Sequence, residues 1–162
     1  RRWSDRVSLE DAPAPVQELL AYWQGKRGKA TLPAKVDIRP EEIPGFLGRI
    51  CILEVMPDPL DFIYRLDGTN IASATNENLT GKSILEARPT EFAKSAFADL
   101  KNTVETGGPT LWVVRMRAEA RHYDYLRLVL PLADREARLR YLLTYSHRFG
   151  VDNGRFPTFD SL

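Results

Sequence analysis

The residues of this chain that could do metal or acid–base chemistry are few and widely spaced. Among its 162 residues are two histidines, His122 and His147, and a single cysteine, Cys51. No group of His, Cys, Asp and Glu has the spacing of metal ligands. Each histidine stands at one end of a predicted strand, beside aromatic residues and arginines, where a solvent or backbone partner is the commoner explanation than a ligand or general base. The sequence predicts no metal centre.

Nucleophilic catalysis finds little support either. Ser146 and His147 are neighbours, but adjacent strand residues point to opposite faces, so their side chains are poorly placed to bond to each other. Cys51 lies within an apolar strand, which indicates a core thiol rather than a reactive one. His122 and Asp124 are two residues apart on one predicted strand and therefore share a face. They are the acid–base pair that a small α+β cone enzyme would use.

Several arginines on the later predicted strands form the most pronounced charged feature. An anion or phosphate site is one interpretation, because guanidinium groups bind such oxygens in a bidentate way. Solvated strand arginines whose stems cover apolar neighbours are the commoner one. The residues are Arg115, Arg117 and Arg127, with Arg138 and Arg140 nearby.

The centre of the chain combines a strand with a turn-rich loop. Residues 61–66 alternate in the period of a half-buried strand, and Gly68 allows a tight reversal into a short helix over 69–75. Asn76, Asn78 and Gly81 then supply turn chemistry. Ile84 and Leu85 are expected to return inward, so this segment is predicted to wrap a pocket.

The motifs in this region carry a family resemblance. YRLDGTNIA at 64–72, followed by NLTGKSILE at 78–86, resembles the PAS superfamily, in particular a bacterial family of single-domain PAS proteins. The resemblance spans residues 19–146. It implies an α+β fold, a five-stranded antiparallel sheet with helices on one face, and says more about fold than about function.

The remaining elements fit that expectation. Val16, Leu19, Leu20 and Trp23 recur at helical spacing and predict an N-terminal amphipathic helix. A long connecting helix is expected from Thr90 until the glycines at 107 and 108. Strands are predicted over 49–56, 61–66, 110–118, 122–132 and 138–147. The predicted organisation is a leader (1–14), a PAS-like domain (15–149) and an irregular tail (150–162).

Apolar residues occupy both faces of the first, third and last strands, which indicates that both faces of the sheet are covered. The apolar stripe of the N-terminal helix is the obvious cover, within the monomer or across a dimer. We expect a homodimer formed through this helix and the sheet face, an expectation that rests on this apolar patch and on similarity to the family's habit.

The predicted ligand site lies between the connecting helix and the sheet. Asn70 and Arg88 are expected to fix the polar groups of a small ligand. The same bulky side chains would also fill the core of a domain that binds nothing. The residues expected to line the site are Tyr64, Phe97, Trp112 and Met116.

The resemblance leaves the cofactor unknown but disfavours two. Haem-binding PAS domains commonly take their axial histidine from the connecting-helix region, and residues 90–107 contain none. A covalently photoactive flavin would need an Asn-Cys-Arg segment after the short helix, where this chain has Asn76-Glu77-Asn78.

Composition narrows the partners. With 23 basic and 22 acidic residues the net charge is +1, which gives no reason to expect nucleic acid or an anionic membrane. No apolar run approaches the roughly 20 residues that span a bilayer. A single cysteine excludes an intramolecular disulfide and suits a reducing compartment, so a cytoplasmic location is expected. The sequence does not begin with Met and shows no signal-like segment, so its true N-terminus is expected to be missing or trimmed.

These observations favour a non-catalytic sensory or regulatory module of bacterial signalling that binds a small ligand or a partner protein. A ligand-free dimerisation or interaction domain is the first alternative. A small α+β cone enzyme is the second. A fully packed pocket would favour the interaction domain over the sensor.

Overall fold

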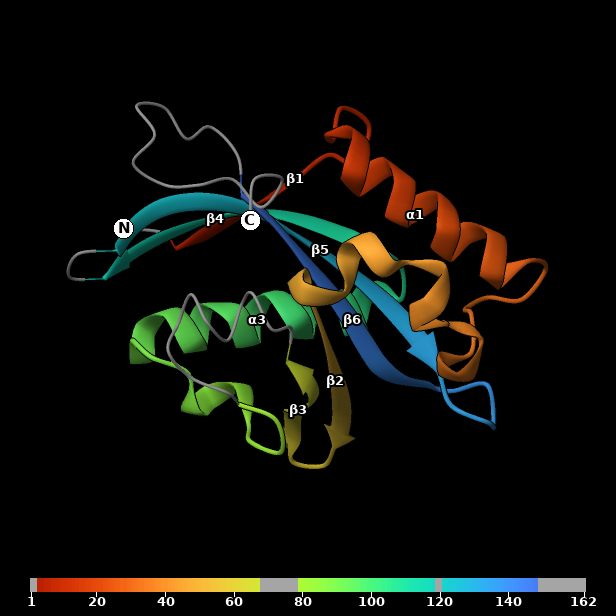
Figure 1. Cartoon of the computed structure of the whole chain (residues 1–162). Helices are drawn as coiled ribbons and strands as arrows, with labels where there is room; N and C mark the ends of the chain where they lie inside the picture. The colour runs from red at the N-terminus through yellow and green to blue at the C-terminus, as the bar shows by residue number, and fades with distance from the viewer. Residues whose placement is uncertain (1–2, 68–78, 119–120, 149–162) are drawn as a thin grey trace.

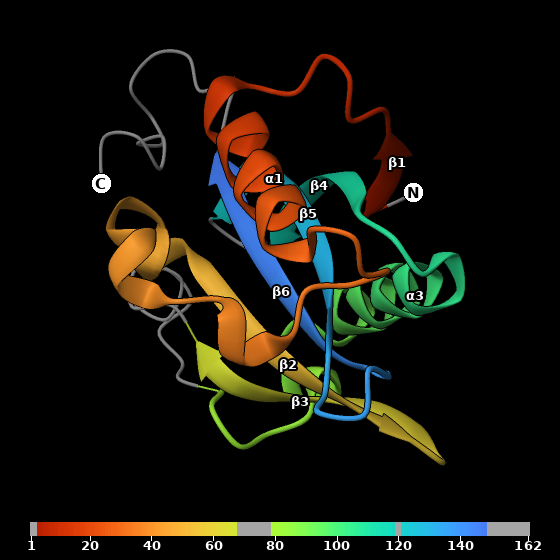
Figure 2. The same cartoon turned by 90° about the vertical axis from the view of Figure 1, so that its right-hand side faces the viewer.

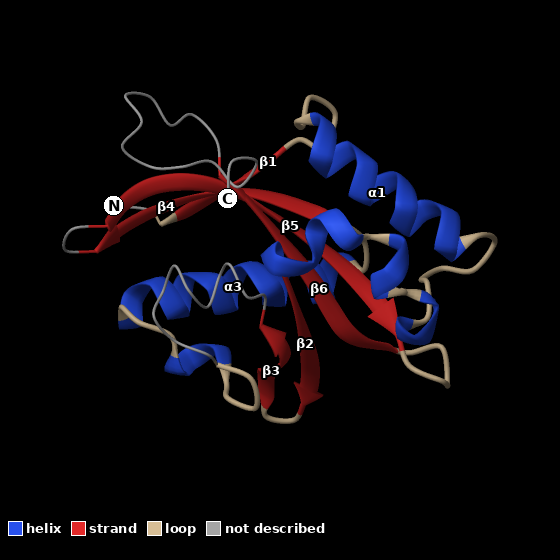
Figure 3. Cartoon of the chain, in the orientation of Figure 1, coloured by secondary structure: helices blue, strands red, loops and turns tan. Residues whose placement is uncertain are grey.

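The computed structural model describes residues 3–67, 79–118 and 121–148. One antiparallel sheet forms its centre, with a helix packed on each face (Figure 1). Figure 3 separates the strands from the helices and loops. The helices and strands are β1 (Ser4–Val7), α1 (Ala14–Arg27), β2 (Ile50–Pro57), β3 (Leu60–Asp67), α3 (Thr90–Thr106), β4 (Thr110–Ala118), β5 (Arg121–Ala133) and β6 (Leu139–Arg148). Short 3₁₀ helices lie between these elements: Lys35–Asp37, Pro40–Glu42 and Pro44–Arg49 between α1 and β2, and Ile84–Glu86 between β3 and α3.

Within the described residues the sheet has six strands in the order β1-β4-β5-β6-β2-β3, so the predicted count of five is wrong. The added strand is β1, which lies within the segment predicted as a leader. It pairs antiparallel with β4, with Ser4 opposite Val114 and Val7 opposite Leu111. The sequence gives no alternation by which to recognise this strand, because it is four residues long and three of its side chains are polar. The strand forms because its backbone bonds to the edge of β4.

Helix α1 covers one face of the sheet, where Figure 2 shows it in front of β5 and β6. The predicted apolar stripe is confirmed as its buried side: Val16, Leu19, Leu20 and Trp23 are all 8% exposed or less. The Trp23 indole N–H donates to the carbonyl of Pro131 in β5 at 2.9 Å. Helices therefore lie on both faces rather than one, and the cover is supplied within the monomer.

Helix α3 covers the opposite face as the predicted long connecting helix. It buries Ala96 and Leu100 against the sheet, and Ala93 against Leu79 and Ala87. Gly107 ends it with a left-handed backbone at φ 75°, where the N–H bonds to the carbonyl of Thr103. Glycine takes this conformation without steric cost, which explains why the helix stops here.

The register of the central strands decides which side chains meet α3. Trp112 stands opposite Arg127, and Val114 stands opposite Tyr125. Directly opposed residues share a face, so these four lie on the α3 side of the sheet. Arg115 is opposite Asp124 and lies on the α1 side. The arginines proposed as one group are thus divided between the two faces.

In the described part of the chain, every helix is too short or too polar to cross a bilayer.

Candidate functional site

The layer between α3 and the sheet is a hydrophobic cluster that unites four of the predicted ligand-site residues. Met116 is 1% exposed and Trp112 is 8% exposed, while Tyr64 and Phe97 are partly buried against them. The Phe97 ring meets Phe62 edge-on, with 5.2 Å between ring centroids. The structure therefore brings Tyr64, Phe97, Trp112 and Met116 together, and their role in binding a ligand stays a prediction.

A chain of hydrogen bonds connects the Trp112 ring to α3. The indole N–H donates to Thr110 Oγ1 at 2.8 Å, and that hydroxyl lies 2.7 Å from Thr103 Oγ1 on α3. The Thr103 hydroxyl in turn donates to the carbonyl of Asp99 at 3.0 Å. All three polar side chains are thus satisfied in a buried setting, and the ring is held in one orientation.

Of the two residues predicted to fix polar groups of the ligand, the structure describes only Arg88, which is not part of this cluster. Arg88 is exposed, and one terminal nitrogen of its guanidinium donates to the carbonyls of Glu86 and Ala87. Asn70 lies outside the described residues, as do the predicted short helix at 69–75 and the turn residues Asn76 and Asn78. Ile84 is buried as expected, whereas Leu85 is 42% exposed.

A buried ion pair at the end of this layer was not predicted. Arg127 of β5 and Asp99 of α3 approach to 3.1 Å, with side chains 8% and 7% exposed. Arg127 also donates to the Tyr125 hydroxyl at 3.0 Å, and its guanidinium lies over the rings of Phe92 and Tyr125 at 5.8 and 5.7 Å. Ser4 of β1 donates to the same Asp99 carboxylate at 2.7 Å.

Burial raises the pKa of the Asp99 carboxyl above its ordinary value, although Arg127 and the Ser4 hydroxyl both act to lower it. Desolvation of a carboxylate opposes its charge, whereas a cation and hydrogen bonds favour that charge. Burying the ion pair therefore costs desolvation free energy. The charged form of Asp99 is favoured by Arg127 and by the Ser4 hydroxyl.

The sequence contained a signal for this pair that the prediction did not use. Asp99 is the acid on the helix face that carries Ala96, Leu100 and Thr103. Arg127 stands inside the apolar run 126–130 of a central strand. A charge placed on an apolar face is rarely buried alone, so each of the two predicts a partner.

Among the described residues, no group of His, Cys, Asp and Glu could hold a metal ion. His147 is buried on the α1 side, with Nδ1 3.2 Å from the Tyr145 hydroxyl, and therefore lies away from the α3 layer. Asp124 pairs with Arg117 at 2.8 Å, and the side chain of His122 lies outside the described residues. Cys51 is buried in the α3-side cluster, as predicted.

The sequence was compared with models of known protein families. A model described as "PAS domain" matches residues 12–144, most of the chain. The chain belongs to the PAS family. The resemblance carried by the motifs at 64–72 and 78–86 is thereby confirmed, and the PAS core begins just before α1, so β1 precedes the matched region.

The solved structures that match this chain include light-oxygen-voltage (LOV) proteins. The Rhodobacter sphaeroides LOV protein is 17% identical with a TM-score of 0.48, over 72% of this chain and 71% of that one. A variant of that protein is 20% identical with a TM-score of 0.49, over 71% and 70%. An RNA-binding LOV receptor is 12% identical with a TM-score of 0.44, and the match covers 89% of this chain but 37% of the receptor. Comparison with curated proteins found no match.

Proposed function

We propose that this PAS domain is a non-catalytic sensory or regulatory module that binds a small, largely apolar molecule between α3 and the sheet. The buried pair of Asp99 and Arg127 carries the proposal. Burying two charges costs several kcal/mol per ion before their attraction is counted, and an apolar replacement is often no less stable. Because the pair is costly to bury, stability alone does not explain it. Its position where α3, β5 and β1 meet supports a role in linking the α3 layer to the edge of the sheet.

The chemistry of the layer supports an apolar ligand with few polar groups. Aromatic and thioether side chains from β3, α3 and β4 converge there, and the Trp112 N–H is already bonded within the protein. A ligand would be recognised chiefly by shape and apolar contact, as in most small-molecule sites.

The proposed response follows from the contacts of α3. A ligand that displaces α3 relative to the sheet changes the geometry between Asp99 and Arg127. Because Ser4 bonds the same carboxylate, that change reaches β1 at the sheet edge. A ligand shifts such an equilibrium only as far as it binds the two arrangements differently.

The wider setting of the proposal is bacterial signalling in the cytoplasm, which rests on the sequence resemblance. A homodimer belongs to it on the same ground. The stripe of α1 that first argued for a dimer is buried on its own sheet, so any dimer would use other surfaces.

A ligand-free interaction domain is the competing function, and the packing of the cluster favours it. Phe97 packs edge-on against Phe62 in the same apolar cluster as Met116, as it would in a filled core. The third function, a cone enzyme, would use Asp124, whose side chain is engaged by Arg117 on the α1 side.

Native mass spectrometry of the purified protein separates the first two functions. A stoichiometric extra mass, identified after denaturation and accompanied by an absorption spectrum, is the expected result. Phe97→Trp adds volume to the layer and is expected to lower ligand occupancy. Leu47→Trp, at an exposed residue of the 3₁₀ turn Pro44–Arg49, serves as the control. A clean apo mass under all conditions would reject the sensor and favour the interaction domain.

A further inference from the structure

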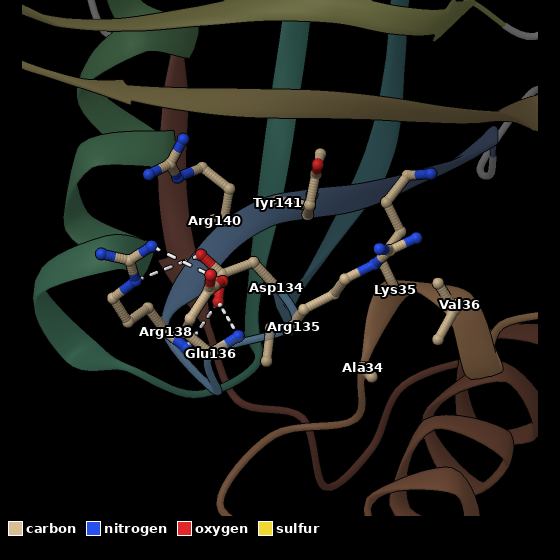
Figure 4. A pocket seen from close by; sticks show the side chains of 10 residues that line it. Ala34, Lys35, Val36, Asp134, Arg135, Glu136, Arg138, Arg140 and Tyr141 are labelled. Atoms are coloured by element: carbon tan, nitrogen blue, oxygen red, sulfur yellow. Dashed lines mark hydrogen bonds and ion pairs between the residues drawn. The ribbon is translucent and has the colours of Figure 1, made fainter.

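A hollow lies at the hairpin between β5 and β6. It has a volume of about 440 Å³, within the range of small-molecule sites. Its walls come from the hairpin and from the 3₁₀ turn at Lys35–Asp37, with Tyr141 of β6 also lining it (Figure 4).

The walls of this hollow are fixed to each other by the backbone. The Ala133 N–H donates to the carbonyl of Pro33 at 2.8 Å, and Ala34 forms an isolated bridge with Ala133. Across the hairpin, Asp134 Oδ1 accepts the N–H groups of Glu136 and Arg138 at 2.9 and 3.0 Å. The hollow is therefore formed before any ligand arrives, which reduces the entropy lost on binding.

Basic side chains dominate the lining: Lys35, Arg135, Arg138 and Arg140, against Asp134 and Glu136. The two carboxylates are directed at one arginine, since Arg138 lies 3.3 Å from Asp134 and 3.6 Å from Glu136. Figure 4 shows these contacts gathered on one side of the hollow.

The other cations of the hollow are less well neutralised. Within the described residues, neither Lys35 nor Arg135 forms an ion pair, and the Lys35 ammonium lies 5.2 Å from the centre of the Tyr141 ring. Arg140 reaches Glu54 only at 3.7 Å, and that carboxylate already holds Arg65 at 2.9 Å. Like charges in one hollow repel, and an anion between them would relieve the repulsion.

We propose that this hollow binds a small organic anion with two acidic groups, held by Lys35 and Arg135 with Arg140 at its side. Carboxylate and phosphate share the required chemistry, since both accept bonds from guanidinium and ammonium groups. Asp134 and Glu136 border the site and would repel a long polyanion, which favours a compact ligand. The site is separate from the α3 layer and stands whether or not that layer binds a ligand.

The test is a titration of the whole ¹⁵N-labelled protein followed by two-dimensional NMR. Succinate is the dicarboxylate probe and inorganic pyrophosphate is the phosphate probe. We expect saturable shifts confined to residues 33–37 and 133–141, and an increased melting temperature with the probe that binds. The stronger of the two probes assigns the acidic group of the ligand.

Variants make the assignment specific. Lys35→Gln and Arg135→Gln should each weaken binding about tenfold, the effect of losing one charge-assisted contact. Lys101→Gln removes the same charge from the exposed side of α3 and should leave binding unchanged. Both pocket positions are at the surface, so the variants are expected to fold.

Three results would overturn the proposal. Equal weakening by Lys101→Gln would show a general charge effect. Shifts spread over the molecule without saturation would show non-specific binding. Binding of poly-glutamate in the absence of any response to succinate or pyrophosphate would identify a surface for an acidic protein instead.

Discussion

The Ser4 hydroxyl donates a 2.7 Å hydrogen bond to Asp99 Oδ2, the same oxygen that lies 3.1 Å from Arg127 Nη1. One carboxylate therefore joins three elements that are far apart in sequence: β1, α3 and β5. Trp3, the residue before β1, adds an edge-on contact with Phe92 of α3 at 5.8 Å between centroids. Strand β1 is thus attached to the α3 layer through side chains as well as to β4 through the backbone.

Removing the Ser4 hydroxyl should loosen β1. We expect Ser4→Ala to lower the free energy of unfolding by about 1 kcal/mol, because the buried Asp99 carboxylate loses one donor. Urea denaturation measures the change. Hydrogen exchange should show the larger effect at residues 4–7, where few bonds must break for the strand to open.

Ser8→Ala is the matched control, since the Ser8 hydroxyl accepts only an exposed bond from the Glu10 N–H. Its effect on unfolding should be smaller, and exchange at residues 4–7 should not change. Unaltered exchange in Ser4→Ala would mean that the backbone pairing with β4 holds β1 without help from Asp99.

The ion pair itself should show strong coupling. Arg127→Met alone leaves the Asp99 carboxylate buried without its cation and is expected to cost about 3–5 kcal/mol of stability. The double variant Asp99→Leu with Arg127→Met removes both charges from an apolar layer, and we expect it to recover most of that loss.

A double-mutant cycle by chemical denaturation measures the coupling between the two positions. Losses that simply add would show that the two side chains act independently, and the link between α3 and β5 would then have to lie in apolar packing. Native mass spectrometry of the double variant also tests the proposed function. If the double variant still binds the ligand, but the ligand no longer changes hydrogen exchange in β1, then ligand binding does not require the ion pair and the effect on β1 does.

The sequence predicted the elements that repeat an apolar pattern, and missed those that do not. The stripe from Val16 to Trp23 was recognised because four apolar residues recur at helical spacing, and the structure buries all of them. Strand β1 was missed because its four residues carry no such pattern. Its position depends on the edge of β4, more than 100 residues further along the chain.

The residues of the candidate site were likewise predicted only in part. Tyr64, Phe97, Trp112 and Met116 are bulky residues on predicted core faces, so their meeting could be foreseen. Arg127 was interpreted with Arg115 and Arg117 because strand alternation alone does not say which strand residues face which helix. That information lies in the register between β4 and β5, which places Arg127 opposite Trp112.

Asp134 should make the β5–β6 hairpin sensitive to acid. Backbone N–H groups, that of Arg138 above all, hold the pKa of its carboxyl below the ordinary value of 3.8. A lowered pKa in the folded state means that the carboxylate stabilises the hairpin above about pH 4, and that this contribution is lost as the pH falls through the folded value.

Asp134→Asn keeps an oxygen that can accept the same backbone bonds but does not titrate. The difference in stability between the native chain and this variant should therefore shrink as the pH falls from 7 to 3, measured by denaturation at each pH. Asp11→Asn, which removes one negative charge from an exposed side chain, is the control for the change in net charge. A constant difference over this pH range would contradict the assigned role of Asp134.

Trp23 tests whether α1 covers the sheet within one molecule. Trp23→Phe removes the indole N–H and leaves the Pro131 carbonyl buried without its donor, which should lower the free energy of unfolding by about 2 kcal/mol. Because α1 packs on its own sheet, the unfolding midpoint of the native chain and of the variant should be the same at low and high protein concentration. A midpoint that rises with concentration in the native chain, and does so less in Trp23→Phe, would instead place this contact in a dimer.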